Sequence, residues 1–210
     1  MNNNATCMLF VNTDGVLTSA GNYWLKDSRK SSKASAMLNP LAIRLLAQFC
    51  EEMGANVVMA TAWEGFMPKP EQWRDCFREV AGVEVPVVGL LSSDYDGNKS
   101  WAAKMDDYMR GYQGWPYVLL EDDPAPENNP RVINVNAQTG LTTVDLQAAA
   151  EMLAPGCDVA KELASLNKSF SPDKRMTIAF GGQAVSVHPR DMGKAFDQLG
   201  LTKSDGNTAQ

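Results

Sequence analysis

The chain has 210 residues and a net charge of −6, with 44% hydrophobic and 21% charged residues. This balance predicts one globular domain with an appendage and excludes a largely disordered or fibrous protein. The acidic charge argues against an extended groove for nucleic acid, and no apolar run is long enough to cross a membrane. The N-terminus MNNNATC lacks the basic and apolar regions of a signal peptide, so we expect a cytoplasmic protein.

Short apolar segments alternate with helical patterns along most of the chain. Apolar runs predict strands over 5–11, 56–60, 85–90, 117–120 and 131–135. Between and after them, apolar spacing and capping residues predict helices over 39–53, 69–81, 98–111 and 142–153, with a loop or flap at 18–36. Because the strands are apolar throughout, we expect an α/β fold: a Rossmann-like, three-layer parallel sheet with helices on both faces.

This pattern is complete near Leu153, and Ala154-Pro155-Gly156 is a suitable boundary. We therefore divide the chain into a core domain at 1–154, a small α+β appendage at 155–201 and a flexible tail at 202–210. The appendage is predicted to hold a helix at 158–167, a hairpin around Gly181-Gly182-Gln183 and a helix at 191–199. Its role is open, as is the oligomeric state.

Polar side chains follow the predicted strands where each strand ends. The polar residues are Asn12 and Asp14 after the first strand, Thr61 after the second, and Glu121, Asp122 and Asp123 after the fourth. Ligands of open parallel sheets bind at this edge. Carboxylate oxygens gathered there suit Mg²⁺, and we expect the metal to be held by Asn12, Asp14, Asp122 and Asp123.

The same edge has groups suited to phosphoryl transfer. A hydroxyl such as that of Thr61 and an ammonium such as that of Lys99 can hold the oxygens of a phosphoryl group. An aspartate at the end of the first strand could attack phosphorus, and a carboxylate two residues later, such as Asp14, could act as acid and base.

These segments resemble motifs of the haloacid dehalogenase-like (HAD-like) hydrolases, of the compact type found in RNA-repair and phage proteins. Asn12-Thr13-Asp14-Gly15-Val16-Leu17 is similar to the family motif DxDG[TV]L. Thr61 in MATAW matches the second motif; Trp63 fits the compact subgroup, whereas Glu64 replaces its usual Arg. Lys99 is the best match to the motif lysine, with Lys104 a weaker one, and VLLEDD and Gly140-Leu141-Thr142 complete the resemblance over about residues 6–153.

The resemblance implies a Mg²⁺-dependent phosphatase without a large cap domain, acting on a phosphorylated small molecule or a nucleic-acid end. It implies a cytoplasmic location, including that of a phage-infected host cell. The residues expected to contact the substrate are Thr61, Ala62, Trp63, Lys99 and Lys30. The catalytic set would be Asn12, Asp14, Thr61 and Lys99, with Asp122 the best candidate of the acidic cluster for the metal.

Position 12 departs from the family, which places the nucleophilic aspartate there. A carboxamide is a poor nucleophile and a weaker metal ligand, so the covalent route is blocked in this sequence. Two explanations stand side by side. The chain is either an engineered Asp→Asn variant that holds a substrate without turnover, or a natural pseudo-phosphatase that binds a phosphorylated ligand or a protein partner.

Simpler roles compete with several of these assignments. Thr61 could serve merely as a helix cap, Trp63 could serve merely to pack against the core, and Lys99 could be a solvated helix residue. The basic segment Lys26, Arg29, Lys30 and Lys33 is either a solvated loop or a flap that faces phosphate.

Overall fold

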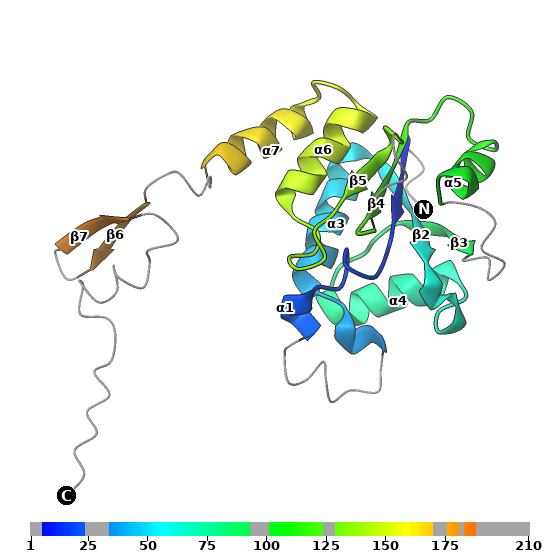
Figure 1. The fold of residues 1–210 in the computed structure, drawn as a ribbon, viewed down its shortest axis with the longest axis horizontal. Helices are drawn as coiled ribbons and strands as arrows, with labels where there is room; N and C mark the ends of the chain where they lie inside the picture. The colour runs from blue at the N-terminus through cyan, green and yellow to red at the C-terminus, as the bar shows by residue number, and fades with distance from the viewer. Residues whose placement is uncertain are drawn as a thin grey trace, which may run out of the picture. The chain divides into compact units, whose positions relative to one another are not determined.

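The computed structural model describes residues 6–23, 34–92, 101–123, 129–169, 176–180 and 183–187. The chain divides into two compact units, Met1–Ala164 and Ser165–Gln210. The first unit is built on a five-stranded sheet in the order β3-β2-β1-β4-β5 (Figure 1). Its strands, all parallel, are β1 (Cys7–Val11), β2 (Ala55–Thr61), β3 (Val87–Ser92), β4 (Tyr117–Glu121) and β5 (Val132–Asn134). The predicted Rossmann-like α/β fold is therefore confirmed.

Helices connect these strands. They are α1 (Ala20–Tyr23), α3 (Pro40–Met53), α4 (Pro70–Ala81), α5 (Trp101–Met109), α6 (Thr143–Leu153) and α7 (Asp158–Ser169), with 3₁₀ turns η1 (Ala34–Met37) and η2 (Ala62–Gly65). Helix α3 begins as its sequence predicts, because the Asn39 side chain accepts a hydrogen bond from the amide of Leu41 at 3.0 Å and Pro40 takes the first helical position. Within the described ranges, every helix is too short or too polar to cross a bilayer.

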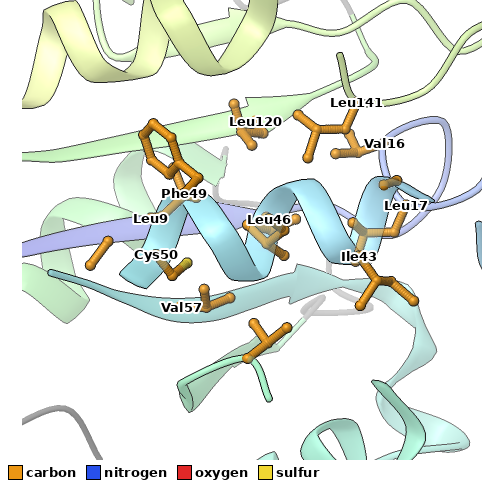
Figure 2. Close-up of a cluster of buried hydrophobic side chains, with 14 of the residues drawn as sticks. Leu9, Val16, Leu17, Ile43, Leu46, Phe49, Cys50, Val57, Leu120 and Leu141 are labelled. Carbon is orange, nitrogen blue, oxygen red and sulfur yellow. The ribbon is translucent and has the colours of Figure 1, made fainter. Parts of the chain in front are cut away.

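The sheet buries both of its faces. Alternate residues of β1 point to opposite sides, so Leu9 and Val11 join a core with α3, α4 and α6, whereas Met8 and Phe10 join a second core with α5. Figure 2 shows the first core, in which the buried side of α3 lies over the sheet. This three-layer packing places the carboxyl ends of all five strands on one edge.

Three local features differ from the expectations. Strand β3 begins at Val87 and ends at Ser92, two residues later than expected, because Pro86 has no amide hydrogen for the ladder and acts only as an acceptor, from the amide of Val57. The expected loop at 18–36 contains α1 and η1. The turn η2 directly after β2 was not expected.

The first unit extends beyond the expected boundary near Pro155. Helix α7 starts at Asp158, and its Ala160 is 0% exposed within the same core as α3 and α6. The second unit contains the predicted hairpin, as β6 (Met176–Phe180) paired antiparallel with β7 (Gln183–Val187). The helix expected at 191–199 and the tail expected at 202–210 lie outside the described residues.

Candidate active site

Three strand ends bring the polar residues together. Asn12 follows β1, Thr61 is the last residue of β2 and Glu121 the last of β4. The register pairs Val11 of β1 with Met59 on one side and Leu120 on the other, so these ends are level. The sequence-based placement of Asn12, Asp14, Thr61 and Asp122 at one edge of the sheet agrees with this geometry.

Both the amino group and the carbonyl oxygen of the Asn12 carboxamide form hydrogen bonds. Its Nδ2 donates to Glu121 Oε1 at 2.5 Å, with a longer contact to Asp122 Oδ1 at 3.4 Å. Its Oδ1 accepts from the backbone amide of Thr13 at 2.6 Å. The donor end of the amide therefore meets a carboxylate, and an aspartate in this place would set two carboxylates against each other.

Glu121 is a buried carboxylate that is only partly satisfied. It is 3% exposed, and its Oε1 also accepts from the backbone amides of Asp122 and Asp123, at 3.1 and 3.3 Å. Its Oε2 is buried without a hydrogen-bond partner among the described residues. Burial raises the pKa of Glu121 to about 7, while the bond from Asn12 opposes this shift. The sequence could not distinguish Glu121 from its two acidic neighbours, and our expected metal set omitted it.

Asp122 lies against the backbone of Gly15. A Cβ built on Gly15 would overlap the Asp122 carboxylate, and Gly15 also has a φ of +63°, a conformation that side chains disfavour. The glycine of the first motif thus makes room for the acidic residue of the fourth. Asp123 differs, because it is exposed and its backbone forms the contacts: its amide donates to Glu121 Oε1, and its carbonyl accepts from Asn134 Nδ2.

Asp14 is bound by the ring of Trp63. The indole Nε1 donates to both carboxylate oxygens, at 3.2 and 3.1 Å. Burial raises the pKa of Asp14, the Trp63 bond opposes this, and the charge of Asp122 adds to the rise. Trp63 itself is 7% exposed and packs near Trp73, with ring centroids 6.3 Å apart. Its ring is therefore mostly packed, and its N–H faces the site.

Thr61 has the capping geometry that we considered as the simpler role. Its hydroxyl accepts from the amide of Trp63 at 3.1 Å, which caps η2, and from the hydroxyl of Thr13 at 2.8 Å. Thr61 and Thr13 are both 0% exposed. Ala62, which follows, is exposed at the same edge.

The expected cations lie mostly outside the part of the chain that the structure describes. Lys99 and the basic segment with Lys30 lie outside the described residues, and the weaker candidate Lys104 lies on α5. Their assignment to phosphate stays a prediction.

The site residues fit a magnesium ion through carboxylates and water. Within the described ranges, no group of three or more His, Cys, Asp or Glu side chains could by itself hold a metal. Mg²⁺ does not require three such side chains, since it is commonly bound by one or two carboxylates and keeps several waters. Asp14 and Asp122 are close enough for their charges to interact. Among the described residues, the buried Oε2 of Glu121 has no donor or positive partner, a role that a cation or its water would fill.

Comparison with known proteins adds the family. The sequence matches the family model described as "HAD domain in Swiss Army Knife RNA repair proteins" over residues 8–146. None of the curated proteins matches the chain. The matched range covers β1 to the first turns of α6, and with them every strand end that forms the site. With its parallel sheet and its motif residues gathered at one edge, the chain belongs to this family of HAD domains.

Proposed function

We propose that the chain is a Mg²⁺-dependent phosphomonoesterase scaffold whose nucleophile position is occupied by Asn12. The observation that carries the proposal is the cluster at one sheet edge: Asp14 held by Trp63, Asp122 seated on Gly15, and the half-satisfied Glu121 next to Asn12. Of these carboxylates, Glu121 is buried and Asp122 is half-buried, and like charges side by side there are unfavourable without a cation. Such a cluster is suited to a site where a metal and a phosphoryl group bind together.

The phosphatase steps below apply to a chain with aspartate at position 12. One carboxylate oxygen attacks phosphorus, the bond from phosphorus to the leaving oxygen breaks, and Asp14 gives that oxygen a proton. Asp14 then takes a proton from the water that hydrolyses the aspartyl-phosphate. Bound Mg²⁺ would neutralise the phosphoryl oxygens. The Asp122 carboxylate and a backbone carbonyl near Asp14 would hold it, which leaves the Asp14 side chain for proton transfer. With Asn12 the first step is blocked.

The favoured substrate is a nucleotide or the phosphorylated end of a polynucleotide. The family's description as a domain of RNA repair proteins supports this class. The segment between β1 and α3 is short, which leaves the site without a large cap and open to a long substrate. The net charge of −6 favours contact with an end over a long groove. A cytoplasmic location fits the four cysteines, which are all free.

A second candidate is a binding protein that has kept the site and lost turnover. One observation favours it: the Asn12 amide complements its surroundings, since it donates to Glu121 and accepts from Thr13. A phosphorylated ligand or protein would then bind through Mg²⁺ at Asp14 and Asp122 without being cleaved.

The test compares the chain with Asn12→Asp under Mg²⁺, using nucleotides, 3′-phosphorylated oligonucleotides and an aryl phosphate. Asn12→Asp should give phosphatase activity on the order of 10⁴–10⁶ above the parent, the usual effect of a covalent nucleophile. Asp14→Ala in that background should abolish the gain. Asn39→Asp, which adds the same charge at the N-cap of α3, where the side chain bonds to the amide of Leu41, should stay inactive. An inert Asn12→Asp variant that still binds a phosphorylated ligand would favour the binding protein.

A further inference from the structure

A cavity adjoins the candidate active site on the side of Asp14. It has a volume of about 370 Å³, and Asp14, Thr18, Met37, Ala137 and Gln138 are among the residues that line it. This volume is within the range of roughly 300–1,000 Å³ typical of small-molecule sites. Glu121, Asp122 and Trp63 do not line it, so it is a separate compartment that shares only Asp14 and Gly15 with the phosphate site.

Most of the walls of this cavity come from two segments that are bonded to each other, and η1 adds Met37. The amide of Ala20 donates to the carbonyl of Ala137 at 3.2 Å, and the amide of Leu141 donates to that of Val16 at 2.9 Å. These bonds fasten the segment after β5 to the segment after β1. The cavity is thus formed by the fold itself and does not need a ligand to shape it.

The described part of its lining is neutral apart from Asp14. Among the described residues, the side chains that line it are hydroxyls, methyls, the thioether of Met37 and the carboxamide of Gln138. Thr18 Oγ1 accepts from the amide of Gly15 at 3.0 Å, which leaves its hydroxyl hydrogen free to donate. Within the described chain, no hydrogen bond holds the Gln138 carboxamide, although its backbone amide bonds to Asn136. A second phosphate would meet a carboxylate here and no described cation, whereas a sugar and base would find donors, acceptors and apolar surface.

We propose that this cavity receives the leaving alcohol of the substrate, and that this alcohol is the neutral sugar and base of one nucleoside. The inference rests on the proposed function and adds to it. In a phosphomonoester the leaving oxygen is bonded to phosphorus and must lie beside the acid that protonates it. Asp14 is that acid and is one of the residues that line this cavity, so the alcohol extends from the acid into it. The thioether of Met37 can contact the base, and Gln138 can read its polar edge. The substrate is therefore a nucleoside monophosphate or a monophosphorylated end.

Calorimetry on the chain as it stands, with Mg²⁺, tests this without requiring turnover. The probes are inorganic phosphate and a nucleoside 3′-monophosphate. We expect the monophosphate to bind at least about tenfold more tightly than phosphate. Gln138→Ala should weaken the monophosphate by roughly three- to tenfold and leave phosphate unchanged, as expected for one or two lost hydrogen bonds.

The control is Gln113→Ala, since Gln113 is also an exposed glutamine and does not line the cavity. It should change neither affinity. Equal binding of phosphate and monophosphate, or an unaffected Gln138→Ala variant, would overturn the leaving-group cavity while the phosphate site stands. If neither phosphate nor nucleotide binds and Asn12→Asp is also inert, the proposed function fails, and this inference fails with it.

Discussion

The indole N–H of Trp63 is shared between the two carboxylate oxygens of Asp14, at 3.2 and 3.1 Å. The bond joins the turn after β2 to the loop after β1. Because it fixes both oxygens, it sets the direction in which the Asp14 carboxyl faces. Trp63 is thus a positioning residue for the proposed acid and base.

Replacing Trp63 should impair turnover more than binding. In the Asn12→Asp background, Trp63→Phe should lower kcat by roughly 10- to 100-fold with little change in KM, the effect of losing a hydrogen bond to a charged group. The matched control is Trp73→Phe, because the Trp73 indole donates to the carbonyl of Met67 and does not touch Asp14. Equal losses in both variants would show that Trp63 acts only through stability.

Asn12→Asp should make folding depend on Mg²⁺. The substitution replaces the amide that donates to Glu121 Oε1 at 2.5 Å with a second carboxylate. In EDTA at neutral pH, we expect the free energy of unfolding to fall by about 1–3 kcal/mol, the cost of a buried polar group left without its partner. Added Mg²⁺ should recover this loss by binding the folded state. Denaturant unfolding with and without the metal measures both effects, and Asn39→Asp is the charge control. A variant that has the parent's free energy of unfolding in EDTA and gains no stability from Mg²⁺ would contradict the geometry described for Asn12 and Glu121.

Gly15→Ala should disturb the site, and Gly82→Ala gives the matched comparison. Both glycines have positive φ, +63° and +72°, so alanine costs about 1 kcal/mol of backbone strain at either position. Nothing lies within 4 Å of a Cβ at Gly82, whereas a Cβ at Gly15 would displace the Asp122 carboxylate. Calorimetry should show Mg²⁺ affinity reduced by roughly tenfold or more for Gly15→Ala alone. Equal affinities in the two variants would mean that Asp122 does not hold the metal.

Two truncations, one after α7 and one before it, should test whether α7 belongs to the core. A chain ending at Ser169 keeps Ala160 and the half-buried Leu163 in the core, and should unfold at a denaturant concentration close to the parent's. A chain ending at Pro155 loses these contacts and exposes apolar surface of the core. We expect it to lose a few kcal/mol of stability, by analogy with large deletions of buried side chains. Equal midpoints for the two fragments would show that the core is complete at Leu153.

Much of the fold could be predicted from local signals. The strands are runs of apolar residues because both faces of the sheet are covered, and Asn39-Pro40 marks the start of α3 by capping chemistry alone. The gathering of Asn12, Asp14, Thr61 and Asp122 followed from one rule, that parallel strands end at the same edge. These features depend on residue type and spacing, which a sequence displays directly.

Other features depend on direction and long-range pairing. Glu121, Asp122 and Asp123 are three acidic residues that the sequence cannot tell apart. Only the path of the backbone at the end of β4 decides that Glu121 is buried while Asp123 is exposed. The bond from Trp63 to Asp14 joins residues distant in sequence, and a tryptophan after a strand is as consistent with simple packing. The packing of Ala160 was missed because a small residue in a polar helix gives no apolar signal.

The hydroxyl bond between Thr13 and Thr61 has a consequence for how a ligand would be received. Both residues are fully buried, and their bond of 2.8 Å links the ends of two strands that are already paired along their length. The walls on this side of the site are therefore fixed before any ligand arrives. A ligand that binds there gives up its own freedom but orders no protein backbone at these two strand ends, so its affinity depends on complementarity with a rigid, preorganised surface.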